Sequence, residues 1–451
     1  MRKCVCSLRA VCVPSLANEE TMALSRVHFL TAFVFAGTIA SGCGAGTSTV
    51  QAPGAGGIPA PIASVAPGGT ATPGGSATST PAPGHTAAPT APGSSATPSA
   101  APTAAATATA PFSLSSVKHV FIVMLENESY SASFGGAQTP YLSTTLPSQG
   151  ALLEDYYSVG HESLDNYIAM ISGQAPSYDT QTDCQDYLNF IYIATLVDGQ
   201  AAGAGCVFPT NVLNITDELS AKGVTWKAYM EDMGNDPARE SATCGHPVLN
   251  MQDHTQDAEA SDQYATRHNP FMYFHTIVDN PICNTNVVNF QHVATDLSSI
   301  ATTANYNYFT PNLCDDGHDS PCANGDAGGL PQINTFLASF IPTILASPAF
   351  KEDGLLIVTF DEAAVSDASS CCGELPGPNS ADPGLAGLGG GVIGAVMLSP
   401  FIKPGTVSMM PYNHYAMLLT TEDIFRVAPL GYSQTSGLNP LGSDVFTNPG
   451  G

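Results

Sequence analysis

Three apolar stretches, HVFIVML at 119–125, LLIVTF at 355–360 and GVIGAVML at 391–398, decide the fold class of this chain. In each of them apolar residues, many of them β-branched, follow one another without polar alternation. Such runs are typical of strands that are buried on both faces, and these strands occur in parallel sheets covered by helices. The three stretches therefore predict a mostly parallel central sheet.

Helical patterns lie between these stretches. Two short patterns, at 165–172 and 216–222, each stop at a glycine, which commonly ends a helix. Longer patterns cover 330–345 and 414–427. Strands that alternate with helices indicate an α/β fold.

The composition of the 451-residue chain is uneven. Residues 44–112 contain no Asp, Glu, Lys or Arg and consist mainly of Ala, Pro, Thr, Gly and Ser. Such a segment cannot bury enough apolar surface to offset its conformational entropy, so we interpret it as a disordered linker. The remaining residues, 113–451, have the size of one large domain.

The chain is strongly acidic, with 12 Lys and Arg against 38 Asp and Glu and a formal net charge of −26. Binding to nucleic acid depends on basic residues, so this balance excludes a nucleic-acid-binding protein. Four of the basic residues precede the linker: Arg2, Lys3, Arg9 and Arg26. The acidic charge therefore belongs almost entirely to the domain.

The beginning of the chain has the pattern of an export signal. A short basic region at Arg26 is followed by an apolar stretch at 29–40, which has the length of a signal-peptide core and is too short to span a bilayer. The small residues before Cys43 resemble a bacterial lipoprotein processing site. We expect residues 1–43 to form a signal-peptide region that truly starts at Met22, with a lipid on Cys43 as membrane anchor. An ordinary cleaved signal peptide is the alternative, and either predicts an extracytoplasmic protein.

Eight cysteines lie in the domain, and an even number in an exported chain favours disulfides over metal thiolates. None of them forms a CxxC pair with zinc-site spacing. Proximity in the sequence suggests three pairs: Cys184 with Cys206, Cys244 with Cys283, and Cys314 with Cys322. The adjacent Cys371 and Cys372 either bridge each other or pair elsewhere.

Acidic and amide side chains follow two of the predicted strands. Glu126 and Asn127 come directly after the first, and Asp361 and Glu362 after the second. Ligands of open α/β sheets bind at the carboxyl ends of the strands. Carboxylates beside an apolar core are costly unless a positive charge lies between them, so we expect a divalent cation there. Exposed loop carboxylates are the alternative.

The segment HVFIVMLENESYSASFG at 119–135 resembles the opening motif of a bacterial and fungal phosphoesterase family that includes secreted acid phosphatases and phosphatidylcholine-type phospholipases C. HESLDNYIAMISG at 161–173 resembles the nucleophile segment of that family. Four further segments match in the family's order: 267–274, 311–319, 355–364 and 399–425. The resemblance covers roughly residues 117–432, nearly the whole domain.

This resemblance implies an alkaline-phosphatase-like, three-layer α/β sandwich that hydrolyses phosphate esters through a phosphoserine at Ser163. Ser163 is expected to open a helix, where backbone N–H groups and the helix dipole favour an anionic phosphate. A metal on the serine oxygen would lower its pKa. The alternative is that Ser163 only caps the helix.

The resemblance further implies that Glu126, Asp361 and Glu362 are carboxylate ligands of the metal. Asn127 is a further oxygen donor to the metal or to the phosphate. A set made only of oxygen donors favours Mg²⁺, Ca²⁺ or Mn²⁺ over Zn²⁺. The two-zinc members of the superfamily have an Asp-His pair where this chain has Asp361 and Glu362.

Three more residues are expected in the catalytic site. Asn166, one helical turn after Ser163, is predicted to donate to a phosphate oxygen. His161 is a candidate phosphate ligand or general acid, and His414 lies in another matched segment.

The resemblance also implies a second metal site or phosphate contacts in the segments around 268 and 316. We assign Asp316 and Asp319 to the metal, and His268 and His318 to the substrate.

The leading prediction is an exported, metal-dependent phosphomonoesterase of the acid phosphatase type, whose partner is a phosphate-ester substrate. One alternative is a phosphodiesterase or phospholipase C acting on lipid headgroups, although no aromatic cluster can be assigned to a choline cage. A catalytically silent, surface-anchored binding module is the second alternative. The presence of Ser163 together with Glu126, Asp361 and Glu362 argues against it. The oligomeric state stays open.

Overall fold

The computed structural model describes residues 112–448. The predicted signal-peptide region at 1–43 and the predicted linker up to residue 111 lie outside the described residues, and both stay predictions. Within the described part, no helix is long and apolar enough to cross a membrane.

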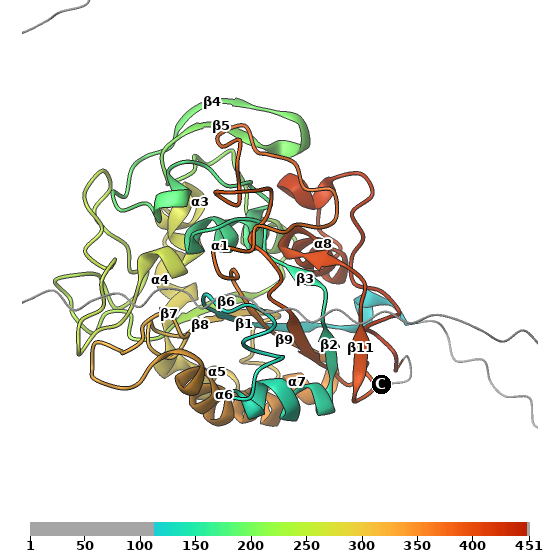
Figure 1. Cartoon of the computed structure of the whole chain (residues 1–451). Helices are drawn as coiled ribbons and strands as arrows, with labels where there is room; N and C mark the ends of the chain where they lie inside the picture. The colour runs from blue at the N-terminus through green and yellow to red at the C-terminus, as the bar shows by residue number, and fades with distance from the viewer. Residues whose placement is uncertain (1–111, 449–451) are drawn as a thin grey trace, which may run out of the picture. The chain divides into compact units, whose positions relative to one another are not determined.

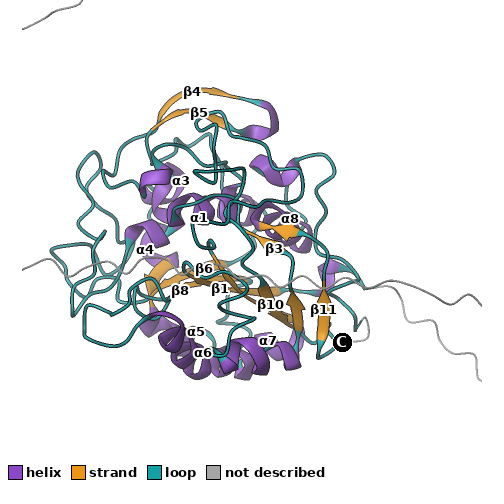
Figure 2. Cartoon of the chain, in the orientation of Figure 1, coloured by secondary structure: helices purple, strands orange, loops and turns teal. Residues whose placement is uncertain are grey.

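An eight-stranded sheet runs through the middle of the structure (Figure 2). Its strands, in spatial order, are β11 (Thr406–Ser408), β2 (Ala151–Leu153), β10 (Ala395–Leu398), β9 (Gly354–Phe360), β1 (His119–Leu125), β8 (Tyr306–Thr310), β6 (Trp226–Met230) and β7 (Val287–Asn289). Two small pairs lie outside it: β3 (Tyr156–Tyr157) with β12 (Tyr412–Asn413), and β4 (Ile191–Thr195) with β5 (Ala201–Ala204).

The centre of the sheet is parallel. Strand β1 lies between β9 and β8, and Val120 is level with Leu355 on one side and Tyr306 on the other. Every residue of β1 and β9 is buried, which accounts for their unbroken apolar sequences. The prediction of an α/β fold with a mostly parallel central sheet is confirmed.

The third predicted strand differs from expectation. Only Ala395–Leu398 of the stretch 391–398 is β-strand, and this strand, β10, runs antiparallel to β9 and to β2. Gly391 and Gly394 have φ values of 86° and 75°, which interrupt extended backbone before the strand begins. An apolar run records burial on both faces but not strand direction, and β10 is an antiparallel member of the mostly parallel sheet.

Helices cover both faces of the sheet, as Figure 1 shows: α1 and α8 lie on one side, and α5, α6 and α7 on the other. The helices are α1 (Ser163–Ser172), α2 (Ile215–Ala221), α3 (His275–Val278), α4 (Cys283–Asn286), α5 (Val293–Asp296), α6 (Gly329–Ala346), α7 (Pro348–Asp353) and α8 (His414–Phe425). The four predicted helical patterns correspond to α1, α2, α6 and α8. Gly173, with φ 66°, ends α1 as expected.

Within residues 112–448 the structure has four disulfides: Cys184–Cys206, Cys244–Cys283, Cys314–Cys322 and Cys371–Cys372. The three predicted pairs are confirmed, and the adjacent cysteines bridge each other.

Candidate active site

The site begins where the neighbouring strands β1 and β9 end. Glu126 follows β1 and Asp361 follows β9, and both are fully buried. The backbone N–H of Asp361 donates to Leu125 O at 2.9 Å, and the N–H of Asn127 donates to Asp361 Oδ1 at 2.8 Å. These bonds extend the strand pairing by one residue and hold both carboxylates at the same edge of the sheet.

Ser163 is the first residue of α1 and is almost completely buried. Its Oγ donates a hydrogen bond to Glu126 Oε2 at 2.7 Å. The preceding residue, Glu162, has φ 81°, a strained value for a residue other than glycine. The N–H of Glu162 donates to Glu362 Oε2 at 2.7 Å, which helps to hold this turn. The turn therefore directs the serine hydroxyl at the end of β1.

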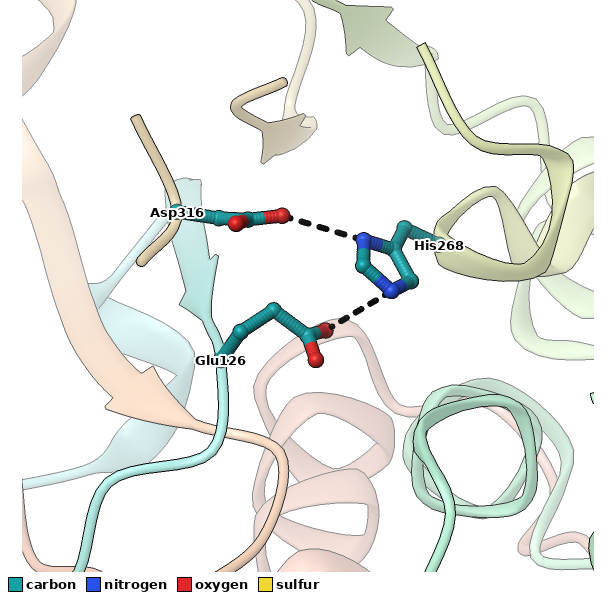
Figure 3. Close-up of side chains that lie close together, drawn as sticks. All are labelled: Glu126, His268 and Asp316. Atoms are coloured by element: carbon teal, nitrogen blue, oxygen red, sulfur yellow. Dashed lines mark hydrogen bonds and ion pairs between the residues drawn. The ribbon is translucent and has the colours of Figure 1, made fainter. Parts of the chain in front are cut away.

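Glu126, His268 and Asp316 converge from three separate segments (Figure 3). His268 Nδ1 lies 3.0 Å from Asp316 Oδ2, and His268 Nε2 lies 3.4 Å from Glu126 Oε1. The second contact is too long for a well-formed hydrogen bond. All three side chains are buried, and each offers a ligand atom within 4.8 Å of the others. We refer to these three residues as the triad.

The elements around the triad fix its geometry. His268 ends a short 3-10 turn, Thr266–His268, and its ring stacks on Tyr167 of α1 with 5.3 Å between centroids and an interplanar angle of 3°. Asp316 lies in the loop after β8, and its backbone carbonyl accepts from the N–H of Glu126 at 3.0 Å. The triad is thus held by the sheet edge, by α1 and by a loop.

Several atoms at this edge are buried without a hydrogen-bond partner: Glu126 Oε1, His268 Nε2 and Asp361 Oδ2. Buried polar atoms are normally hydrogen-bonded. Atoms that lie together with unshared electron pairs and no hydrogen-bond partner are therefore suited to bind a metal cation. Burial raises the pKa of Glu126 and of Asp316 and lowers the pKa of His268. A cation would offset this cost, since it favours the carboxylate forms and the neutral imidazole.

The expected set of metal ligands is divided in the structure. Glu126 and Asp316 lie together, but the third member of their group is His268, which the sequence had assigned to the substrate. Because one donor is an imidazole, the argument from an all-oxygen set for Mg²⁺, Ca²⁺ or Mn²⁺ does not apply to the triad. Glu362 points elsewhere: its Oε2 lies 2.9 Å from His161 Nδ1 and accepts from the N–H of Glu162.

His161 and His414 are both fully buried, and both ring nitrogens of each have partners. His161 Nε2 lies 3.0 Å from Asp367 O, in addition to its contact with Glu362. His414 Nδ1 lies 3.0 Å from the Tyr156 hydroxyl, and its Nε2 lies 2.8 Å from Asp361 O. Burial lowers the pKa of His414 to about 4. Neither ring has a free nitrogen, and the roles expected for His161 and His414 in the catalytic site stay predictions.

Asn166 is also saturated. Its Oδ1 accepts from the N–H groups of Val159 and Gly160 at 3.0 and 3.1 Å. Its Nδ2 donates to Gly160 O and Glu162 O at 3.0 and 3.2 Å. These four bonds use the whole hydrogen-bonding capacity of the amide. Asn166 shapes the turn before Ser163, and it has no free position for the phosphate oxygen expected from the sequence.

The remaining predicted residues lie at the margin of the triad. His318 Nδ1 lies 2.8 Å from Asp319 Oδ1, so this carboxylate is turned toward His318. Asn127 is exposed, and its Nδ2 donates to Glu126 Oε2 at 3.2 Å.

Sequence reasoning missed two buried charged residues, Arg267 next to His268 and Asp165 in the helix of Ser163. Arg267 is buried, and its Nη2 donates to His318 Nε2 at 3.1 Å. Asp165 of α1 is buried with neither carboxylate oxygen hydrogen-bonded. Arg267 lies in the segment 267–274. The resemblance of this segment to the phosphoesterase family was a signal that Arg267 could belong to the site.

The chain matches one family model and several curated relatives. The model of the phosphoesterase family matches residues 132–428. A probable acid phosphatase from Kluyveromyces lactis is 27% identical over 70% of this chain and 60% of its own length. A phosphatidylinositol-3-phosphatase from Mycobacterium tuberculosis is 25% identical over 71% of this chain and 81% of its own.

The matches to the acid phosphatases span 42% to 60% of the length of those relatives. Among solved structures, a protein of the alkaline phosphatase superfamily from Vibrio parahaemolyticus is 15% identical with a TM-score of 0.42, covering 73% of this chain and 72% of its own. Since the family model matches well over half of the sequence, the chain belongs to the phosphoesterase family.

Proposed function

We propose that this protein is an exported, metal-dependent phosphomonoesterase of the acid phosphatase type that works through a phosphoserine at Ser163. The observation that carries the proposal is the 2.7 Å hydrogen bond from Ser163 Oγ to Glu126, beside buried atoms that lack partners. The acid phosphatase relatives support the reaction type.

The triad and Asp361 are the residues that would hold the metal. A bound divalent cation would stabilise charge on the phosphoryl oxygens and favour the alkoxide form of the serine. The residues of the chain itself supply the remaining functions. Ser163 Oγ forms a bond to phosphorus as the bond to the leaving oxygen breaks, and its proton is directed at Glu126 Oε2. The leaving oxygen takes up this proton and departs as the alcohol. Water then hydrolyses the phosphoserine, which releases inorganic phosphate and restores the Ser163 hydroxyl.

The turn before Ser163 is held by side chains whose polar atoms already have hydrogen-bond partners. His161, Glu362 and Asn166 bind backbone and one another, so we assign them to positioning. Fixed geometry of this kind contributes to catalysis, because a small displacement of the nucleophile is costly in rate.

A phosphomonoester on a phospholipid headgroup is a second candidate substrate. The Mycobacterium tuberculosis relative is named a phosphatidylinositol-3-phosphatase and matches over most of its length. Hydrolysis of the diester bond, as in a phospholipase C, is a further alternative from the sequence, as is a silent binding module.

The proposal is tested by turnover of p-nitrophenyl phosphate and of the bis-ester analogue by the purified chain, with and without EDTA. We expect EDTA-sensitive turnover that favours the monoester and is lost in Ser163→Ala. Ser172→Ala is the matched control, because Ser172 ends the same helix and donates to Ile168 O. Absence of turnover of every phosphate ester contradicts the proposed enzyme, and full activity of Ser163→Ala contradicts the assigned nucleophile.

The proposed lipid anchor has its own test. Wild type and Cys43→Ala are expressed in a bacterium supplied with labelled palmitate. We expect label only in the wild type, and equal labelling of the two would exclude Cys43.

A further inference from the structure

We propose that Arg267 binds the phosphate of the substrate, and that the carboxylate of Asp183 occupies in the free enzyme the place that a phosphate oxygen takes in the complex. The inference rests on the proposed phosphoester hydrolysis at Ser163 and names the group that recognises the charge of the substrate.

Arg267 is a buried cation in an acidic domain. Its Nη1 donates to Gln256 O at 2.7 Å, its Nη2 donates to His318 Nε2 at 3.1 Å, and its Nε lies 3.5 Å from Asp183 Oδ2. Within residues 112–448, Arg267 and Arg239 are the two buried arginines. A buried guanidinium is costly without an anion, and a phosphate is an anion that its planar array of N–H groups fits well.

Asp183 connects this arginine to the nucleophile helix. Asp183 Oδ1 accepts a hydrogen bond at 3.0 Å from the N–H of Leu164, the residue after Ser163. The other carboxylate oxygen, Oδ2, lies 3.5 Å from Arg267 Nε. An N–H in the first turn of a helix together with a guanidinium is an arrangement that binds phosphate oxygens. The carboxylate is therefore held by two groups that would serve a phosphate, next to the proposed nucleophile.

The contact between Arg267 and Asp183 is long enough for a phosphate oxygen to replace the carboxylate. Charge-assisted N–H to O bonds are typically about 2.7–2.9 Å long, whereas Nε and Oδ2 lie 3.5 Å apart. The Asp183 side chain is 14% exposed and the Arg267 side chain 4%. The carboxylate is thus the more exposed partner of the pair.

Arg267 is joined to the triad as well. It precedes His268 in the same short turn, and the ring of His318, to which it donates, lies 5.5 Å from the ring of His268. The charge of the whole domain repels an anionic substrate, so attraction has to be local. Among the ion pairs of lysine and arginine in the described residues, that of Arg267 includes the sequence neighbour of His268, and its aspartate accepts from the N–H of Leu164, the residue after Ser163.

The chain offers a matched control in its other buried arginine. Arg239 also pairs with an aspartate, Asp262, at 3.5 Å, and Asp262 also accepts a backbone N–H, from Tyr264 at 3.2 Å. The other partners of Arg239 are backbone carbonyls, such as Asp257 O. The two pairs have the same N to O distance and equally buried guanidinium groups, but the pair of Arg239 and Asp262 contacts none of the predicted site residues.

The experiment uses the metal-loaded wild type and four variants. Calorimetry measures the binding of inorganic phosphate to each protein. Steady-state kinetics measures the inhibition constant of inorganic phosphate against turnover of p-nitrophenyl phosphate. We expect Arg267→Lys to weaken phosphate binding about tenfold, because a bidentate contact is lost. Asp183→Asn is expected to tighten it about threefold or more, since a competing negative charge is removed. Arg239→Lys and Asp262→Asn are expected to match the wild type.

Two results overturn the inference. The first is phosphate affinity in Asp183→Asn that equals or falls below that of the wild type. The second is an Arg267→Lys variant that changes only kcat or melting temperature, as a purely structural arginine would. Should Arg267→Lys fail to fold, Asp183→Asn decides the matter alone. Phosphate binding that follows the expected order without any turnover would contradict the proposed function and leave the binding role of Arg267 supported.

Discussion

Histidine and glutamate side chains occur on both sides of the site, but their hydrogen bonding differs. On the side of the triad, His268 Nε2 and Glu126 Oε1 are buried without hydrogen-bond partners. On the side of the turn before Ser163, His161 has a partner at both ring nitrogens, and Glu362 Oε2 is bonded to His161 and to the N–H of Glu162. The difference indicates that unsatisfied groups are available for a ligand, while saturated groups hold the backbone.

The largest effect is expected at Glu126. Glu126→Gln keeps the size of the side chain but removes the charge that faces Ser163 and His268. We expect kcat/KM to fall by about 1,000-fold or more, because the nucleophile loses its acceptor and the metal loses a ligand. Steady-state kinetics and elemental analysis measure the two losses. Retention of both activity and metal would remove Glu126 from the site.

Replacing a histidine on each side separates their roles. We expect His268→Gln to lower bound metal and reduce activity about 100-fold, and His161→Gln to retain the metal while lowering kcat. EDTA followed by metal addition should restore the wild type and His161→Gln fully but His268→Gln only weakly. The comparison fails if both variants lose metal to the same extent.

A smaller effect is expected at His414, which bonds the Tyr156 hydroxyl and Asp361 O. His414→Phe leaves these two buried groups without a partner, which we expect to cost about 1–3 kcal/mol in the free energy of unfolding. The effect on kcat should be smaller than that of His268→Gln. Urea denaturation checks the first expectation, and an undiminished stability would contradict it.

The smallest effect concerns Glu422 of α8, away from the triad. Burial raises the pKa of Glu422 from 4.5 to about 8, and it is bonded by Ser433 Oγ and the N–H of Leu430. A raised carboxyl pKa in the folded state stabilises the protein below the unfolded pKa, and this stability is lost as pH rises toward the folded pKa.

The wild type should therefore become less stable between the two pKa values of Glu422, 4.5 and about 8. Glu422→Gln should remove part of this slope and gain roughly 2 kcal/mol at the upper end. Melting temperatures across the pH range measure the slope. Parallel curves for the two proteins would show that Glu422 is ionised in the folded state.

The sequence predicted some elements closely and missed others. Strands β1 and β9 and helices α1 and α8 carry their own signals, because a continuous apolar run or a helical period reflects burial along one segment. Strand β8, next to β1, was not predicted, because YNYFT mixes polar and aromatic residues. Its place beside β1 becomes clear only when the sheet is assembled.

The site shows the same division. Glu126 and Asp361 could be placed together from sequence, because the carboxyl ends of buried parallel strands lie at one edge. The association of His268 with Glu126, and of Asp183 with Arg267, joins segments that are distant in the chain. No local pattern contains these contacts.

The sequence by itself thus determined the fold class, the acidic edge of the sheet, the disulfide pairs between nearby cysteines and the resemblance to the phosphoesterase family. The tertiary structure decided which polar atoms were already satisfied. Local patterns record whether a segment is buried, but the hydrogen-bond partners of a buried group come from elsewhere in the chain. That is why Asn166, expected to contact phosphate, and His414, expected in the catalytic site, are hydrogen-bonded within the protein, and His268 lies between two carboxylates.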